Sequence, residues 1–152
     1  MESGIKIRKM ETADYDQVKA LWMSIHGFCI RSIDDSREGV ERFIRRNPTT
    51  SIVAEKDGQI VGSILCGHDG RTACLYHVCV SEAFRKKGIG RAMVDEALKA
   101  LRLEKISKVY LVAFTNNEVG NQFWKDMGWT FREDFNYYDF KLNSENHFEF
   151  NA

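Results

Sequence analysis

The seven residues from Arg85 to Arg91 carry the clearest chemical signal in this sequence. Four of them are cationic and two are glycine, in the order Arg85, Lys86, Lys87, Gly88, Ile89, Gly90 and Arg91. The segment joins an apolar, strand-like run to an amphipathic helix, and the first turn of a helix presents unpaired backbone N–H groups and the positive end of the helix dipole. Glycines there allow a bulky anion to approach the backbone. The pattern therefore predicts a binding site for a phosphate or pyrophosphate.

Two common nucleotide-binding motifs do not fit this segment. A P-loop requires G-x-x-x-x-G-K-[ST], which is absent, and a dinucleotide-binding fingerprint requires a third glycine where this chain has Met93. The alternative is a solvated loop whose charges keep a helix start soluble. Cations at a helix N-terminus oppose the dipole, however, and so favour a bound anion.

The histidines and cysteines show no metal-binding or nucleophile pattern. The histidines occur singly, and the cysteines lack C-x-x-C spacing. Three of the cysteines lie in strand-like apolar runs, where a thiol packs as a small hydrophobic group. We therefore expect reduced core cysteines and no metal site, with Cys29, in a looser segment, as the one that could be exposed. These residues are His26, His68, His77, His147, Cys29, Cys66, Cys74 and Cys79.

The elements that position these residues begin with a short strand around Ile5 and Ile7, followed by two helices. Thr12 begins the first helix, and Ser36 can cap the second, which Asn47-Pro48 ends. Three antiparallel strands follow, over Ser51–Glu55, Gln59–Cys66 and Thr72–Val80. Asp57-Gly58 and Asp69-Gly70 separate them, and Asp-Gly supplies the positive φ values of a two-residue type I′ hairpin turn.

The second half of the chain alternates helices and strands. A long helix after Gly90, a strand over Lys108–Phe114 and a helix after Asn117 precede a closing hairpin of Trp129–Phe131 and Tyr137–Leu142. The segment from Thr72 to Phe114 is then a right-handed parallel crossover in an otherwise antiparallel sheet. This order predicts a single α/β domain over residues 1–142, with a mixed sheet flanked by helices, and a frayed tail over residues 143–152.

Alternation along the apolar strand Thr72–Val80 sorts its side chains into two faces. Cys74, Tyr76, Val78 and Val80 share one face, and Leu75, His77 and Cys79 share the other. A histidine has an ordinary pKa near ~6.5 and suits proton transfer. The position of His77 on the second face favours a core histidine, unless a β-bulge intervenes.

The balance of positive and negative charges limits the kinds of partner that this protein can bind. The 152 residues contain 22 Lys plus Arg and 22 Asp plus Glu, so the formal net charge is zero. This disfavours a general nucleic-acid or membrane-surface binder, whose surface would be basic. The N-terminal residues lack the apolar run of a secretory signal, and no run approaches the ~20 residues of a membrane span. We therefore expect a cytoplasmic protein, as a monomer or homodimer.

Two motifs resemble signatures of the GNAT superfamily, the general-control-related N-acetyltransferases. Val80-x-x-x-x-Arg85-x-x-Gly88-x-Gly90 after an apolar strand is similar to the acyl-CoA-binding signature of that family. Asn117 followed by Phe123-Trp124-Lys125-Asp126-Met127-Gly128-Trp129 resembles its second signature, an Asn and then F-Y-x-x-x-G-F. The resemblance extends over the whole order of elements, from Ile5 to Leu142.

The resemblance implies acetyl-CoA as the donor, and a fold in which the two parallel strands splay apart around it. Backbone N–H groups from Arg85 to Gly90, with Arg91, would hold the pyrophosphate. The main chain of Val78, Cys79 and Val80 would pair with the pantetheine arm, and the N–H of Val78 or Cys79 would stabilise the oxyanion of a tetrahedral intermediate. Asn117 and the helix that carries Trp124 would flank the pantetheine.

The proton-transfer residues of the family are altered in this chain. Trp124 stands where the family often has a Tyr, and an indole N–H does not protonate a leaving group. Cys74, Tyr76 and Val112 stand where some members carry a basic Glu or His. His68-Asp69 and Asp34-Asp35 lie where the family admits the acceptor. They would bind a cation or relay a proton, or else serve as turn residues and a solvated acidic pair.

Three tyrosines are the candidate catalytic residues. Tyr137 and Tyr138 follow Asn136, and this run resembles one in family members that acetylate protein N-termini. Tyr76 lies on the strand before the cationic segment. The alternative for each is packing on a β surface.

Three functions compete on this basis. The first is an acetyl-CoA-dependent N-acetyltransferase that transfers the acetyl group directly to a primary amine, on a small molecule or a protein N-terminus. The second is a non-catalytic acyl-CoA-binding module or sensor, which Trp124 and the missing glutamates favour. The third is a nucleic-acid contact through Arg85–Arg91 with Arg42, Arg45 and Arg46, which the neutral charge disfavours.

Overall fold

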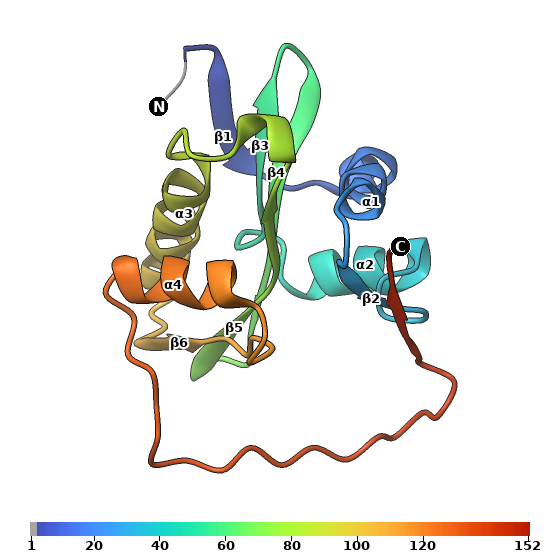
Figure 1. The fold of residues 1–152 in the computed structure, drawn as a ribbon, viewed down its shortest axis with the longest axis vertical. Coiled ribbons are helices and arrows are strands. Elements are labelled where there is room, and N and C mark those ends of the chain that lie inside the picture. The colour runs from blue at the N-terminus through green and yellow to red at the C-terminus, as the bar shows by residue number, and fades with distance from the viewer. Residues whose placement is uncertain (1–2) are drawn as a thin grey trace.

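A five-stranded sheet forms the centre of the computed structural model, which describes residues 3–152 (Figure 1). The strands lie in the order β1-β3-β4-β5-β6, and all neighbours are antiparallel except β5 and β6, which are parallel as predicted. Their bounds are β1 Ile5–Lys9, β3 Ile52–Lys56, β4 Gln59–His68, β5 Thr72–Val80 and β6 Lys108–Tyr110.

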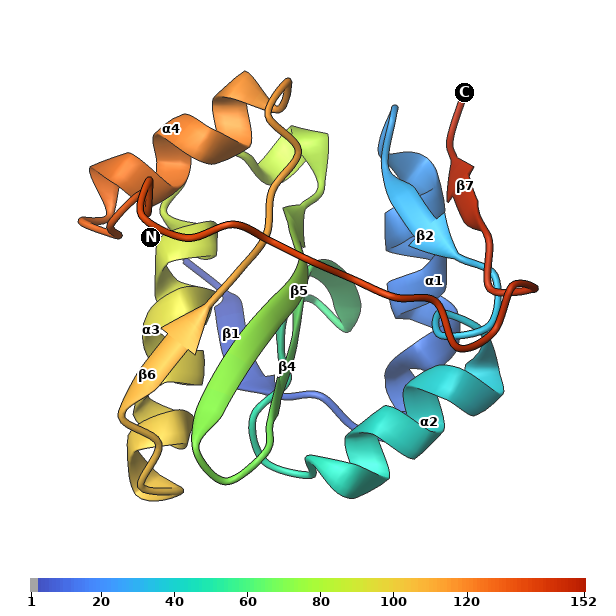
Figure 2. The same cartoon turned by 90° about the horizontal axis from the view of Figure 1, so that it is seen from below.

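Helices cover both faces of the sheet (Figures 1 and 2). α1 (Tyr15–Ser24) and α2 (Arg37–Arg46) cover one face, and α3 (Ile89–Leu103) and α4 (Glu118–Asp126) lie on the other. Short 3-10 turns, η1 (Thr12–Asp14) and η2 (Glu82–Phe84), precede α1 and follow β5. Ser36 caps α2 as predicted, because its hydroxyl accepts a hydrogen bond from the Gly39 N–H. Each face has its own buried apolar cluster.

The two hairpin turns differ from each other. Asp57 and Gly58 have φ values of 51° and 80°, which confirms the predicted two-residue turn. The connection between β4 and β5 is one residue longer, over residues 69–71. There the Asp69 carboxylate accepts hydrogen bonds from the Arg71 and Thr72 N–H groups. The prediction of the same tight turn at Asp69-Gly70 is wrong, because the side chain of Asp69 stabilises a wider loop.

A β-bulge interrupts β5 at His77, whose φ is 51°. Ser63 pairs with Cys79 and Leu65 pairs with Tyr76, so His77 and Val78 lie opposite Ile64 alone. The extra residue reverses the alternation of side chains. The predicted grouping of Cys74 and Tyr76 with Val78 and Val80 is therefore wrong. Cys74 and Tyr76 face α2, and the two valines pack against the cluster beneath α3.

The C-terminal part of the chain differs most from the prediction. Residues 129–142 form no hairpin in this structure, and β6 ends at Tyr110 rather than Phe114. The tail expected to fray contains β7 (Phe148–Phe150), which pairs antiparallel with β2 (Cys29–Arg31). The Asn151 side chain fixes this pairing by donating to the carbonyls of Trp22 and Ile25. Between residues 3 and 152, no helix is long and apolar enough to cross a membrane.

Candidate active site

The cationic segment folds as a turn that leads directly into α3. Gly88 adopts a φ of 83° at the N-cap of α3, and Lys86 also has a positive φ, of 61°. A Cβ at Gly88 would meet nothing within 4 Å, so the backbone conformation is what requires glycine there. A Cβ at Gly90 would lie 3.3 Å from the ring of Phe123, so Gly90 instead allows α4 to pack closely. The two glycines therefore have different roles.

The charges around this turn fit a bound polyphosphate. The first turn of α3 contains no acidic residue. The side chains of Arg85, Lys86, Lys87 and Arg91 are exposed. Arg85 donates from Nε to the Val80 carbonyl at 3.1 Å, which ties the turn to the end of β5. Backbone N–H groups, a helix N-terminus and four cations form a donor set that suits a phosphate or pyrophosphate group.

The parallel strands pair only at their beginnings. Thr72, Ala73 and Cys74 pair with Lys108, Val109 and Tyr110, and the pairing of β5 with β6 does not extend beyond these residues. Val78 and Val80 lie past this point, between the bulge and the cationic turn. The main chain of β5 on this side is therefore available to an extended ligand.

Asn117 and Trp124 occupy structural positions beside these strands. Asn117 caps α4, because its Oδ1 accepts a hydrogen bond from the Gly120 N–H at 3.0 Å. Trp124 packs against Trp129, with ring centroids 4.7 Å apart. The helix α4 also lies next to the start of α3, because the Phe123 ring packs close to Gly90.

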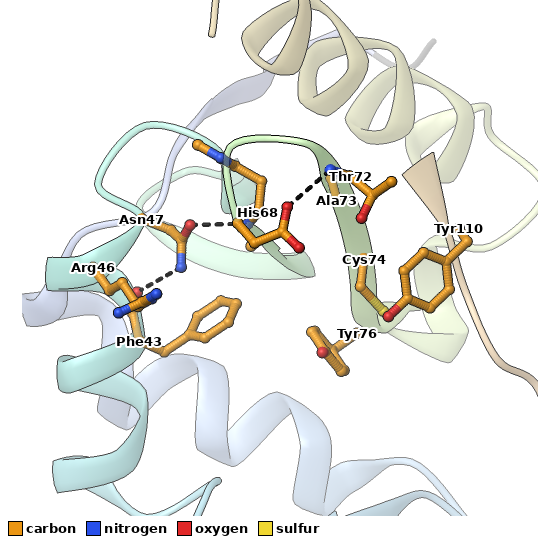
Figure 3. A pocket seen from close by; sticks show the side chains of 11 residues that line it. Phe43, Arg46, Asn47, His68, Thr72, Ala73, Cys74, Tyr76 and Tyr110 are labelled. Atoms are coloured by element: carbon orange, nitrogen blue, oxygen red, sulfur yellow. Dashed lines mark hydrogen bonds between the residues drawn. The ribbon is translucent and has the colours of Figure 1, made fainter. Parts of the chain in front are cut away.

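A pocket of about 310 Å³ opens on the α2 face, at the paired ends of β5 and β6 (Figure 3). It is lined by Phe43, Arg46, Asn47, Gly67, His68, Asp69, Thr72, Ala73, Cys74, Tyr76 and Tyr110. Tyr76 and Tyr110 both interact with the Cys74 thiol. Burial is the largest cause that raises the pKa of Tyr76 above its usual range. Tyr76 therefore remains protonated at neutral pH, which excludes a role as a base.

The three candidate tyrosines lie in different places. Tyr76 lines the pocket, but Tyr137 and Tyr138 lie on an extended segment, with 66% and 87% of their surfaces exposed. Sequence reasoning missed Tyr110. The register that places Tyr110 beside Cys74 follows from the parallel pairing of β5 and β6, which alternation within one strand cannot show.

The bulge brings His77 to Asp35. His77 Nε2 lies 2.8 Å from Asp35 Oδ2, and the imidazole packs against the rings of Trp22 and Phe28, with centroids 4.8 and 5.1 Å from its own. Asp35 is only 4% exposed, so the expectation of a solvated acidic pair is wrong for it. Its carboxylate also accepts from the Arg31 N–H, and its carbonyl accepts from the Tyr15 hydroxyl. The expected placement of His77 on the Leu75 face is also wrong, because of the bulge.

The cysteines are free thiols, as predicted. Burial raises the pKa of Cys66 to about 12 and the pKa of Cys79 to about 11. Both therefore stay neutral and unreactive at physiological pH. Within residues 3–152, no group of three or more His, Cys, Asp or Glu side chains is arranged to hold a metal ion.

Comparison with known proteins identifies the class. The sequence profile of the "Acetyltransferase (GNAT) family" matches residues 15–129. An acetyltransferase of Pectobacterium atrosepticum is 30% identical over 114 residues, which are 75% of this chain and 79% of that protein. The chain therefore belongs to the GNAT acetyltransferase family and is an N-acetyltransferase that uses acetyl-CoA.

Solved structures share the fold. The PaiA N-acetyltransferase of Thermoplasma acidophilum, in complex with coenzyme A, superposes with a TM-score of 0.69 at 20% identity, covering 84% of this chain and 89% of that one. A ribosomal-protein-alanine N-acetyltransferase of Brucella melitensis biovar Abortus superposes with a TM-score of 0.66 at 18% identity, covering 91% and 99%. An aminoglycoside acetyltransferase from a soil metagenome superposes with a TM-score of 0.70 at 18% identity, covering 93% of this chain and 99% of that one.

Proposed function

We propose that this enzyme transfers the acetyl group of acetyl-CoA directly to a primary amine, on a small molecule or a protein N-terminus. One observation carries the proposal, namely that two sites lie at opposite ends of the same strand, β5. The anion-binding turn follows the end of β5, and the pocket on the α2 face lies at its beginning, so a single strand connects donor and acceptor sides. The names of the structural neighbours, which include N-acetyltransferases of a protein alanine and of aminoglycosides, support an amine acceptor.

The donor half of the site consists of main-chain groups and cations. Acetyl-CoA, when bound, supplies the acetyl group as a thioester. The N–H groups of residues 85–90 and the Arg91 side chain hold the pyrophosphate, and Val78 to Val80 pair with the pantetheine. The N–H of Val78 or Cys79, next to the bulge, stabilises the oxyanion that develops on the thioester oxygen.

The acceptor half requires a group that takes the amine proton. The Asp35 carboxylate can only accept a hydrogen bond, so Nε2 of His77 carries a proton and donates to it. The other ring nitrogen, Nδ1, then keeps a lone pair that accepts a proton. The amine nitrogen forms the new bond to the acetyl carbon as the carbon–sulfur bond breaks. The amine proton passes to His77 Nδ1. The departing thiolate takes a proton from Tyr76 or from water, and because the pKa of a thiol is near ~8.5, this step needs little help.

A thermal-melt titration tests the donor site, because a ligand that binds only the folded state raises its stability. Acetyl-CoA and coenzyme A should both raise the melting temperature, and ATP should not. Release of thiol in the presence of candidate amines then tests turnover. Binding without turnover on any amine class would favour the alternative, an acyl-CoA-binding module or sensor. No shift with either CoA compound would overturn the proposed donor site.

A variant pair locates the pyrophosphate. Gly88→Glu places a negative side chain where the anion sits, and Gly88→Asn keeps a residue that tolerates a positive φ. Gly88→Glu should abolish the shift with coenzyme A, whereas Gly88→Asn should retain most of it. Equal shifts in both variants would contradict the assignment.

A further inference from the structure

Three phenylalanine rings contact one another at the surface, those of Phe114, Phe148 and Phe150, which we call the phenylalanine cluster. Their centroids lie 6.0 to 6.4 Å apart. The three residues are 53%, 50% and 61% exposed. Large apolar side chains that gather at the surface rather than in a core mark a place where a ligand or a partner binds. The cluster therefore offers an apolar contact surface that its own chain covers only in part.

The phenylalanine cluster bridges two parts of the fold that are far apart in the sequence. Phe114 follows β6, on the segment that leads to α4, whereas Phe148 and Phe150 belong to β7, which pairs with β2 (Figure 2). Asn151 fixes β7 next to α1, because its side chain donates to two carbonyl groups there. The folded chain thus sets the position of the cluster before any ligand binds.

The β2 residues opposite the two phenylalanines of β7 share the face of the cluster. Cys29 pairs with Phe150, and Arg31 pairs with Phe148. Ile30, between them, is 3% exposed and packs in the apolar core beneath α1 and α2. Because side chains alternate along a strand, Arg31 points away from that core. Its guanidinium lies over the cluster, 4.9 Å from the centroid of the Phe148 ring.

Arg31 also adjoins the proposed general base. Its N–H donates to Asp35 Oδ2 at 2.6 Å, and the same oxygen lies 2.8 Å from His77 Nε2. The charge of the Arg31 side chain reaches the pocket on the α2 face as well. Burial raises the pKa of Tyr76, which lines that pocket, and Arg31 partly offsets this rise. One residue thus links the phenylalanine cluster, the base and the pocket.

The guanidinium of Arg31 can bind an anion. Asp34 Oδ2 lies 3.9 Å from Arg31 Nη1, which is beyond hydrogen-bond distance, and that oxygen accepts a hydrogen bond from Asn146 Nδ2 at 2.8 Å. The Arg31 side chain is 48% exposed. A guanidinium has five N–H donors and binds a carboxylate through two of them at once. Arg31 therefore favours a carboxylate as the charged group of a ligand on the phenylalanine cluster.

We propose that the acceptor is a free α-amino acid with a large apolar side chain, an assignment that rests on the proposed function. Its side chain packs on the phenylalanine cluster, its carboxylate binds the Arg31 guanidinium, and its α-amine points to Nδ1 of His77. The amine nitrogen bonds to the acetyl carbon as the carbon–sulfur bond breaks. The amine proton passes to His77, and the thiolate takes a proton from Tyr76 or from water. The products are an N-acetyl amino acid and coenzyme A.

The charge of Arg31 disfavours other classes of amine acceptor. A polyamine or an aminoglycoside carries further ammonium groups, which the guanidinium would repel. A protein N-terminus presents a neutral amide at the position of the carboxylate and leaves the charge of Arg31 unpaired. An α-amino acid carries its amine, carboxylate and side chain on one carbon, which matches a base, a cation and an apolar cluster that adjoin one another.

A series of acceptors tests this class, with thiol release from acetyl-CoA as the readout. The kcat/KM for L-phenylalanine should exceed that for 2-phenylethylamine, which lacks the carboxylate, at least ~10-fold. It should exceed that for L-alanine, which lacks the large side chain, by at least ~10-fold as well. A tripeptide that begins with phenylalanine has an amide in place of the carboxylate and should react no faster than 2-phenylethylamine.

Two variants test the contacts, each with a matched control. Phe114→Ala should lower kcat/KM for L-phenylalanine at least ~10-fold and leave that for L-alanine unchanged. Phe114 lies outside the pairing of β2 with β7, so the tail should keep its place. Arg31→Gln should abolish the preference for L-phenylalanine over 2-phenylethylamine. Phe140→Ala, at an exposed phenylalanine outside the cluster, and Arg45→Gln, at an exposed arginine 3.8 Å from Glu41 Oε1, should match the wild type.

Binding without turnover separates this inference from the proposed function. N-acetyl-L-phenylalanine has no free amine, and calorimetric titration should show that it binds the enzyme in the presence of coenzyme A. Phe114→Ala and Arg31→Gln should each raise its dissociation constant at least ~10-fold. Melting curves of all variants verify that the protein remains folded and that coenzyme A still stabilises it.

The other outcomes are distinct. If no amine gives thiol release, the proposed function fails. If other amines react while L-phenylalanine does not react and its N-acetyl form does not bind, the acceptor class fails and the proposed function stands. A faster reaction of the tripeptide would assign the site to a protein N-terminus and overturn the free amino acid. Unchanged preferences in Arg31→Gln and Phe114→Ala would overturn the proposed contacts.

Discussion

His77 Nε2 lies 2.8 Å from Asp35 Oδ2, and this hydrogen bond joins a bulge in β5 to the loop before α2, across 42 positions of sequence. The imidazole can hold this place only because the bulge turns it toward α1, where it packs against Trp22 of that helix and Phe28 of the following loop. A buried carboxylate that also accepts a main-chain N–H keeps the ring orientation fixed. A fixed imidazole next to the bulge is a candidate general base, and that role requires the acceptor amine to come within hydrogen-bond reach of Nδ1.

The variant His77→Asn tests this role. Asn tolerates the left-handed backbone conformation of residue 77, so the bulge should persist while the base is lost. We expect kcat for amine acetylation to fall by ~10²- to 10⁴-fold, with the dissociation constant of acetyl-CoA unchanged. His26→Asn, at an exposed histidine that does not line the pocket, is the control and should keep most of the activity. A His77→Asn enzyme within two-fold of the wild-type rate would show that His77 is a structural histidine.

Tyr76 should act as a proton donor rather than a base. Because burial holds the pKa of Tyr76 above its ordinary value, the hydroxyl stays protonated from neutral to mildly alkaline pH. Tyr76→Phe should therefore lower kcat by a similar factor at every pH from 7 to 9, leaving the shape of the profile unchanged. Tyr137→Phe, on the exposed segment between α4 and β7, is the comparison for loss of a phenol. Should Tyr76→Phe instead remove an alkaline limb of the profile, Tyr76 would titrate in that range and the donor role would fail.

The local structure of the proposed donor half was predictable from the sequence, and that of the proposed acceptor half was not. The cationic turn depends on residues adjacent in the chain, and β5 has the predicted bounds, Thr72–Val80. The bulge at His77 was not predictable, because it depends on how β5 pairs with Ser63 and Leu65 of β4. The sequence around Asp35 suggests an exposed carboxylate. In the structure Asp35 is buried only because it contacts β5 and α1.

The C-terminal strand illustrates the same limit. In Phe148–Phe150, apolar and charged residues alternate over only three positions, a pattern that does not distinguish a strand from a frayed tail. It becomes a strand because Cys29–Arg31 offers a partner from the other end of the chain, and because Asn151 donates to two carbonyls near α1. Pairing at such separation leaves no local pattern to detect.

Charge reversal at the start of α3 should weaken binding of the cofactor. Arg91→Glu places a negative charge beside the N-terminus of α3, so the dissociation constant of coenzyme A should rise at least ~10-fold at low salt. Arg102→Glu makes the same change in the last turn of α3 and should leave the affinity unchanged. Calorimetric titration of both variants measures the difference. If both affinities fall equally, the effect is one of net charge and the turn is not the pyrophosphate site.

The ion pair between Arg8 and Asp14 should make stability depend on pH. The two side chains lie 2.8 Å apart, and Asp14 also accepts the Glu11 N–H. Burial alone would raise the pKa of Asp14, but the hydrogen bonds from Arg8 and Glu11 outweigh it and lower the pKa below the ordinary value. A carboxyl whose pKa is lowered on folding stabilises the protein above its unfolded pKa, near ~3.9, and this stabilisation is lost as pH falls through the folded value.

Asp14→Asn should therefore lower the free energy of unfolding by about 1–3 kcal/mol at pH 7, because it leaves the part-buried Arg8 guanidinium with a weaker partner. The difference from wild type should shrink as the pH is lowered from about 4 toward 2. Asp16→Asn breaks an exposed pair with Arg37 and should cost less than ~1 kcal/mol at any pH. Urea unfolding at each pH provides the measurement. A constant difference for Asp14→Asn down to pH 2 would mean that its effect is due to packing and not to charge.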